Sequence, residues 1–198
     1  SNSLGLVVEP QSWTAVHSNI QGSHVLAIRS NGTLYAWGVN NNGQLGDGTT
    51  TNKSSPVLIG TGNSWTLVRT GSLLSMAIKN DGTLWAWGLG TALGLNNTSG
   101  LTGNSTINRS SPVQVGTSSW SQVSAGGSFS LSFSTAILAT GALFTWGSPN
   151  SGQLGDGTIL HRSSPVQVGS LTIWSNIVTG YYNFALAKQI YRSEEHTS

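Results

Sequence analysis

The chain has 198 residues and no cysteine, and only 7% of its residues are charged, which leaves a net charge of +2. The low charge excludes a charge-driven disordered tail, and the absence of cysteine excludes disulfides, thiolate zinc sites and a cysteine nucleophile. No apolar run reaches the roughly 18 residues of a membrane helix, so we expect no membrane span. The basic residues are scattered rather than clustered, which argues against nucleic acid as a partner.

Both ends of the chain differ from the rest. We interpret residues 1–12 as the end of a preceding repeat, because residues 4–8 look like its last strand. The sequence RSEEHTS at residues 192–198 shares nothing with the rest of the chain and looks like a translated sequencing-adapter stem. We therefore interpret it as a non-native tail and leave it out of the fold prediction.

Internal repeats are the main signal between these ends. Trp13, Trp65, Trp120 and Trp174 follow one another at intervals of 52, 55 and 54 residues. A fixed period of this length is typical of repeat architectures. We divide the chain into repeats at 13–64, 65–119 and 120–173, with a truncated fourth repeat at 174–191, all within one domain.

Each complete unit is predicted to hold four short strands. The first follows the leading Trp, and the second is an apolar stretch such as HVLAI or LSMAI. A hairpin turn follows, as at Asn31-Gly32 in the first unit, because both central residues of such a turn need positive φ. The third strand, for example TLYAWG, is apolar on both faces and is therefore expected between two neighbouring sheets. The fourth strand follows Ser-Ser-Pro, where proline favours a sheet edge.

Four strands in each unit of about 50 residues, stacked face to face, predict an all-β fold: a partial β-propeller with about three complete four-stranded blades and an incomplete fourth. The motifs GSHVLAI, NGTLYAWG, GQLGDGT and SSPV, which recur in one order, resemble the regulator of chromosome condensation repeat family, in its bacterial or phage-like form. The resemblance covers about residues 13 to 188. Since family members typically have seven blades, it implies that the chain holds a part of a propeller.

The resemblance also implies a function. We expect a non-catalytic protein-binding or scaffold module that takes no cofactor and has another protein as its partner. One alternative is guanine-nucleotide exchange on a Ran-type small GTPase, which the eponymous member performs. Another is a structural part of a larger cell-surface or virion protein. The two end faces of a partial propeller should expose apolar surface, so we also expect the chain to self-associate. Too few carboxylates and histidines are present for a catalytic set to be proposed.

Candidate partner-binding residues lie near the Ser-Ser-Pro elements. Lys53, Arg109 and Arg162 each precede a repeated proline by three residues. We expect Lys53 and Arg162 to pair with Asp47 and Asp156, six residues upstream, and Arg109 to lack such a partner. The second unit replaces GQLGDGT with a longer loop, which is where insertions and binding residues tend to gather. Its candidates are Asn96, Asn97 and Asn104.

Further expectations concern individual side chains. The loop GQLGDGT is read as structural, with glycines at positive φ, a buried Leu and an Asp that accepts backbone hydrogen bonds. His24 is expected to pack and hydrogen-bond within its own blade, and His17 to lie in an exposed loop. Phe129 is taken as the equivalent of His24 in the third unit, so that four extra residues fall in the second hairpin of that unit.

Overall fold

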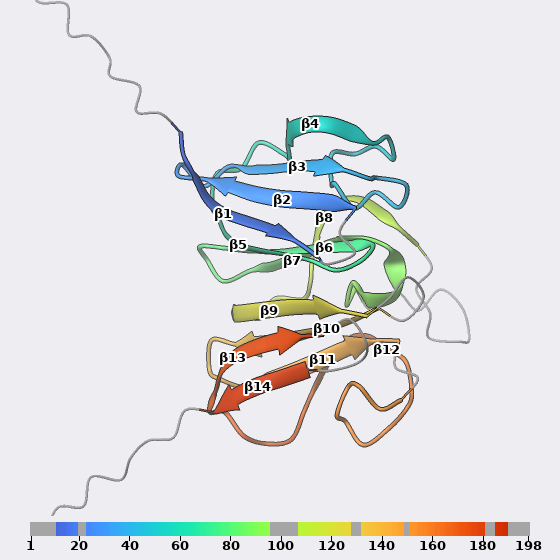
Figure 1. Ribbon diagram of the computed structural model, residues 1–198. Helices are drawn as coiled ribbons and strands as arrows, with labels where there is room; N and C mark the ends of the chain where they lie inside the picture. Colours follow the sequence, from blue (N-terminus) through green and yellow to red (C-terminus); the bar gives the residue numbers. More distant parts are fainter. Residues whose placement is uncertain are drawn as a thin grey trace, which may run out of the picture.

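The computed structural model describes residues 11–19, 23–95, 107–127, 132–148, 151–180 and 185–189, the last of these as backbone only. Within them, three four-stranded antiparallel sheets follow one another along the chain, and a two-stranded sheet comes last. In each four-stranded sheet the strands are ordered as they occur in the sequence. Figure 1 shows the sheets stacked face to face, as blades of a propeller. The predicted three blades and incomplete fourth are confirmed.

The strand bounds follow the repeat. Blade 1 consists of β1 (Trp13–Ser18), β2 (His24–Arg29), β3 (Leu34–Gly38) and β4 (Lys53–Leu58). Blade 2 consists of β5 (Trp65–Thr70), β6 (Leu74–Lys79), β7 (Leu84–Gly88) and β8 (Arg109–Gln114), with a single 3-10 turn, η1 (Gly90–Ala92), after β7. Blade 3 consists of β9 (Trp120–Gly126), β10 (Phe133–Leu138), β11 (Leu143–Gly147) and β12 (Arg162–Gln167). The start of blade 4 consists of β13 (Trp174–Thr179) and β14 (Ala185–Gln189).

The register between the second and third strands corrects one sequence assignment. His24 lies opposite Gly38 and Leu74 opposite Gly88. In blade 3 it is Phe133 that lies opposite the corresponding glycine, Gly147. Phe129 is therefore not the equivalent of His24. The extra residues of the third unit fall between its first and second strands, because the distance from the second strand to the Trp-Gly pair is the same in all three blades.

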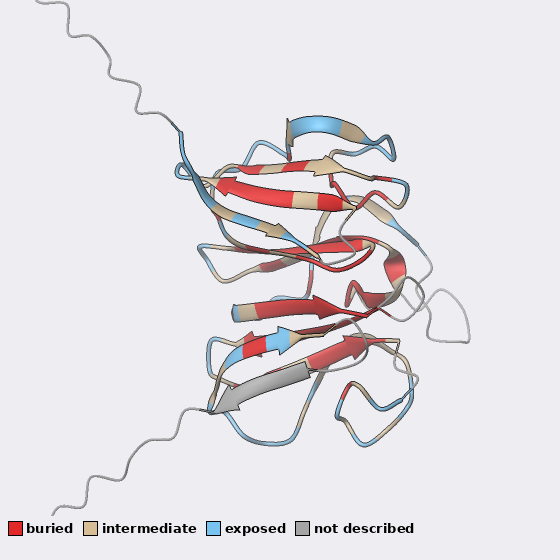
Figure 2. Cartoon of the chain, in the orientation of Figure 1, coloured by how far each residue is buried: buried red, intermediate tan, exposed pale blue. Residues whose placement is uncertain are grey.

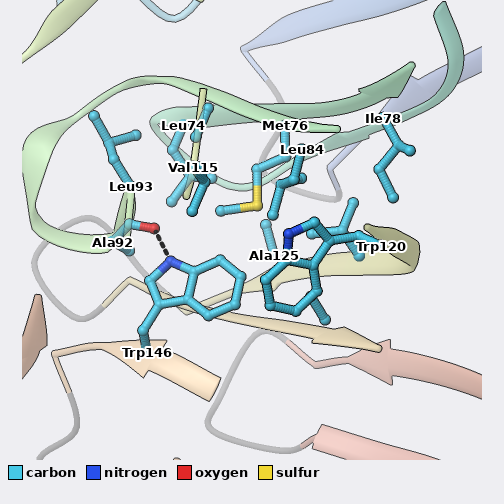
Figure 3. Close-up of a cluster of buried hydrophobic side chains, with 13 residues drawn as sticks. Leu74, Met76, Ile78, Leu84, Ala92, Leu93, Val115, Trp120, Ala125 and Trp146 are labelled. Carbon is cyan, nitrogen blue, oxygen red and sulfur yellow. Dashed lines mark hydrogen bonds between the residues drawn. The ribbon is translucent and has the colours of Figure 1, made fainter. Parts of the chain in front are cut away.

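The core lies between the blades, where the third-strand tryptophans are placed. Trp87 and Trp146 are both fully buried, each against the preceding blade. Figure 3 shows Trp146 reaching from blade 3 into the side chains of blade 2, where its indole nitrogen donates a hydrogen bond to the carbonyl of Ala92. The indole of Trp87 makes the corresponding bond to the carbonyl of Gln44 in blade 1. The same type of hydrogen bond, from an indole to a backbone carbonyl, thus joins blade 2 to blade 1 and blade 3 to blade 2.

Trp37, the equivalent residue of blade 1, is less completely buried than Trp87 and Trp146. The reason is its position: the described residues place no sheet against that face of blade 1 (Figure 1). On the same blade Trp13 keeps 42% of its surface exposed, whereas Trp65 and Trp120 keep 6% and 5%. Figure 2 shows the contrast between the largely buried strands β6 and β7 of blade 2 and the mostly exposed edge strand β4. Trp13, Val16 and Leu58 of blade 1 expose apolar surface.

None of the described helical segments is long and apolar enough to cross a membrane.

Candidate functional site: the basic residues at the start of the fourth strands

Three basic residues occupy one structural position. Lys53, Arg109 and Arg162 are the first residues of β4, β8 and β12. Each lies opposite the glycine that ends the third strand of its blade. They therefore share one place at the same end of the sheets, as the repeat predicted.

The loop of blade 1 supplies a carboxylate to its basic residue. The ammonium of Lys53 lies 3.3 Å from Oδ2 of Asp47. The other carboxylate oxygen of Asp47 accepts hydrogen bonds from the backbone and hydroxyl of Thr49 and from the amide of Asn40. Burial alone would raise the pKa of Asp47, but the bonds from Thr49, Lys53 and Asn40 outweigh it and hold the pKa below its usual value.

The loop of blade 3 repeats this arrangement with arginine. Nε of Arg162 donates to Oδ2 of Asp156 at 2.7 Å, and a terminal nitrogen of the guanidinium donates to the hydroxyl of Thr158. Burial opposes ionisation of Asp156 here too, yet the bonds from Arg162 and Thr158 leave its pKa below the ordinary value. Both predicted ion pairs are confirmed.

Arg109 differs from its two equivalents. Within the described part of the chain it has no carboxylate partner, and its Nε is buried without a hydrogen-bond acceptor. The second blade has Leu95 where the others have an aspartate. Arg109 is thus a half-buried cation whose charge is not neutralised by any carboxylate of the described residues. Asn96, Asn97 and Asn104 lie outside the described residues.

Sequence reasoning missed a contact beside Arg109. The amide of Asn108 donates to the side-chain oxygen of Asn42 in the loop of blade 1, and its own oxygen accepts from the backbone of Gly90. The backbone N–H of Gly48 also donates to the carbonyl of Ser110. The loop of one blade therefore rests against the fourth strand of the next, and the Arg109 position is held rigidly from two blades. The asparagines were visible in the sequence, but nothing in their spacing showed that they meet.

Two histidines are structural rather than exposed. The hydroxyl of Ser75 donates its proton to the carbonyl of Gln44. The hydroxyl oxygen is therefore the acceptor of the hydrogen bond from Nε2 of His24, at 2.8 Å. His24 therefore bonds to the next blade, not within its own as expected. Burial, with nearby His17 as the smaller cause, lowers its pKa to about 4. His17 lies in β1 rather than in a loop, and its Nδ1 accepts a hydrogen bond from the backbone N–H of Thr70.

The loop GQLGDGT has the structural role that was predicted for it. Gly43, Gly46 and Gly48 all have φ near +80°, and Leu45 is fully buried. Asp47 is used by the turn and by Lys53. Across the described residues, no group of three or more His, Cys, Asp or Glu side chains comes together as a metal site would require.

These features define a class of protein: a repeat protein built of β-propeller blades, in which an indole-to-carbonyl bond joins blade 2 to blade 1 and blade 3 to blade 2. The model of the regulator of chromosome condensation (RCC1) repeat matches residues 31–78, 81–133 and 140–186. The chain belongs to this family.

Known proteins agree with this assignment. The chain is 42% identical over 64 residues to the E3 ubiquitin-protein ligase HERC2 of Homo sapiens, which covers 31% of this chain and 1% of HERC2. The crystal structure of Prp20p from Saccharomyces cerevisiae, described with its binding to Gsp1p and histones, matches 88% of this chain and 43% of its own, with a TM-score of 0.70 and 20% identity. Yeast RCC1 (Prp20) bound to Kap60 matches 91% and 43%, with a TM-score of 0.70 and 18% identity. The chain thus spans less than half of these relatives, and the structural likeness concerns the fold.

Proposed function

We propose that this chain is a non-catalytic protein-binding module whose contact surface is centred on Arg109 and recognises an acidic group of a protein partner. The observation that carries the proposal is the difference among three equivalent cations. Lys53 and Arg162 are neutralised by aspartates of their own loops, whereas no described residue supplies a carboxylate to Arg109. Arginine is enriched at the energetic centres of protein interfaces, where it makes paired hydrogen bonds to carboxylates.

The remaining charges support an acidic partner. The described aspartates, Asp47, Asp81 and Asp156, each accept two hydrogen bonds from a threonine two residues further on. These carboxylates therefore stabilise the turns of this chain. Elsewhere, Arg29 and Lys79 lie over aromatic rings of their own blades. Arg69 also has no carboxylate partner among the described residues, but its guanidinium donates to the carbonyl of Val68. We favour Arg109 because its two structural equivalents are paired and it is not, within the described residues.

The test compares matched variants. Partners are captured on the immobilised chain, identified, and their dissociation constants measured against Arg109→Ala and against Lys53→Ala, which removes a cation at the same structural position. We expect Arg109→Ala to weaken binding at least about tenfold, and Lys53→Ala to change it by less than about twofold. Binding should also weaken as salt is raised. Equal effects of the two variants would remove Arg109 from the interface.

Guanine-nucleotide exchange is the alternative with a direct assay. The fold shared with Prp20p, whose binding to Gsp1p its structure describes, is what favours it. Release of labelled GDP from a Ran-type GTPase is measured with and without the chain. Under our proposal the release rate does not change, and a clear acceleration would put exchange first. A purely structural role in a larger surface protein would leave no separable partner in the capture experiment.

A further inference from the structure

The first strands of the blades lie next to one another along one edge of the stack. β1 contacts β5, β5 contacts β9, and β9 contacts β13, whereas the fourth strands lie at the opposite edge of each sheet. Because a first strand pairs only with the second strand of its own blade, every other backbone N–H on it points away from the sheet. Such an N–H needs an acceptor from elsewhere.

Two blade boundaries supply this acceptor in the same way. Between blades 1 and 2, the backbone N–H of Thr70 donates to Nδ1 of His17 at 3.1 Å. Between blades 3 and 4, the backbone N–H of Thr179 donates to the hydroxyl oxygen of Ser124 at 3.2 Å. His17 and Ser124 occupy one position, the fourth residue after the leading tryptophan of each unit. A neutral acceptor at that position therefore serves the next blade.

The boundary between blades 2 and 3 is different. Its equivalent position holds Arg69, whose side chain has no acceptor atom. The N–H to be served belongs to Ala125, which lies opposite Ser134 as Thr70 lies opposite Ser75. This N–H therefore points away from its sheet like that of Thr70, and no described side chain accepts a hydrogen bond from it. Both groups at this boundary are donors.

Arg69 brings a positive charge that no described carboxylate neutralises. One terminal nitrogen donates to the carbonyl of Val68 at 2.8 Å, which holds the guanidinium against its own strand and leaves its other N–H groups. Burial, with the nearby charge of Arg69 as the smaller cause, lowers the pKa of His17. The imidazole is therefore neutral at neutral pH, and because Nδ1 is an acceptor, its proton is on Nε2.

A hollow of about 200 Å³ opens at the C-terminal ends of these first strands. Its wall draws on blades 1 to 4 and includes His17, Thr70, Ser124, Ala125 and Thr179. Imidazole, hydroxyl and backbone N–H groups thus surround it, and Arg69 adjoins the wall through Thr70. A volume this small is below that of sites for drug-sized ligands and suits a small ion.

We propose that this hollow binds a small phosphate-type oxyanion, held by the guanidinium of Arg69, the backbone N–H of Ala125 and Nε2 of His17. Hydrogen bonds between arginine and phosphate are strengthened by charge, and backbone N–H groups in a concave surface favour anions. The donors come from three blades around the hollow, which suits a tetrahedral anion better than a planar carboxylate. The anion is either free phosphate or the head of a phosphate ester. The inference is independent of the role proposed for Arg109.

The test measures the binding of inorganic phosphate to the full chain by titration calorimetry. Arg69→Ser gives this boundary the residue that blade 3 has at the equivalent position, Ser124, so a hydroxyl can serve the N–H of Ala125. Arg69→Lys keeps the charge and loses the planar guanidinium. Lys79→Gln is the matched control, because it removes one positive charge from the same blade at the other end of the sheet, outside the hollow.

We expect Arg69→Ser to weaken phosphate binding at least about tenfold, Arg69→Lys about threefold, and Lys79→Gln less than about twofold. Phosphate should also raise the melting temperature of the native chain and of Lys79→Gln, but not that of Arg69→Ser. No binding to the native chain would overturn the proposal. Equal losses in Arg69→Ser and Lys79→Gln would overturn it too, because net charge alone would then attract the anion.

Two further ligands and one variant define the site. O-phosphoserine that binds as tightly as inorganic phosphate would assign the hollow to a phosphate ester, and much weaker binding would assign it to the free ion. Acetate should bind at least about fivefold more weakly than phosphate, and equal binding would overturn the choice of a tetrahedral anion. His17→Ser keeps an acceptor for Thr70, as Ser124 does for Thr179, and removes the imidazole donor. We expect it to weaken binding about threefold, and an unchanged affinity would overturn this arrangement of donors.

Discussion

His24 makes the stability of this protein depend on pH in a range where its aspartates contribute little. It is 1% exposed and donates from Nε2 to Ser75, while its Nδ1 is buried without a partner in the described structure. Burial lowers its pKa from 6.5 to about 4. Between these values the unfolded chain binds a proton that the folded chain does not, so stability falls as the pH falls.

The size of the effect follows from the two pKa values. The loss attributable to His24 is about 2 kcal/mol on going from pH 7 to pH 5, and about 3 kcal/mol by pH 4. For a domain of this size, 2 kcal/mol corresponds to about 4–8 °C in melting temperature. This is a large fraction of the stability of an ordinary domain.

The assay is urea unfolding of the wild type and His24→Leu at pH 7, 6 and 5. Leucine is the natural residue at the equivalent position of blade 2, Leu74, so the site can hold it. We expect the variant to lose much less stability than the wild type across this range, because only the charges of the other histidines remain to be accommodated. Ser75→Ala, which removes the hydrogen bond but keeps the imidazole buried, should retain the wild-type pH dependence. Parallel pH profiles for the wild type and His24→Leu would refute the reasoning.

Three further substitutions test the packing between blades and the ion pair of the loop in blade 3. Trp87→Ala should cost about 3–5 kcal/mol in urea unfolding and Trp37→Ala clearly less, because only the first is enclosed by a preceding blade; equal costs would contradict that difference. Asp156→Asn should cost about 1 kcal/mol at pH 7. The folded pKa of Asp156 lies below the unfolded value of 3.8, so the stability that the ion pair contributes is present above pH 3.8 and is lost as the pH falls through the folded pKa. If the difference in stability between the wild type and Asp156→Asn persisted below that pKa, it would argue against the ion pair. The melting temperature of Gly46→Ala should be well below that of Gly60→Ala. Both glycines have positive φ, but only a Cβ at position 46 would press on the indole of Trp87. Similar melting temperatures of the two variants would exclude that contact.

The sequence was most informative where spacing repeats and least where a contact joins two blades. The intervals between tryptophans predicted the blades, and the repeated spacing of aspartate, basic residue and proline predicted the two ion pairs. They failed at Phe133, because the run around it offers several apolar registers, and only its distance from Trp146 decides among them. They did not show that Trp37 is less completely buried than Trp87 and Trp146, because a repeat pattern makes all units look equal, whereas the described residues place no sheet against the outer face of blade 1.

The indole-to-carbonyl bond between blades escaped sequence reasoning for a physical reason. The second unit was interpreted as lacking the loop motif GQLGDGT, because residues 91–97 read TALGLNN, with Ala92 in place of Gln44. The contact, however, is made by the carbonyl of that residue, which every amino acid has. Only the leucine that fills the core and the glycine that admits the ring are restricted in type. A pattern based on side chains therefore misses a site whose polar group is the backbone.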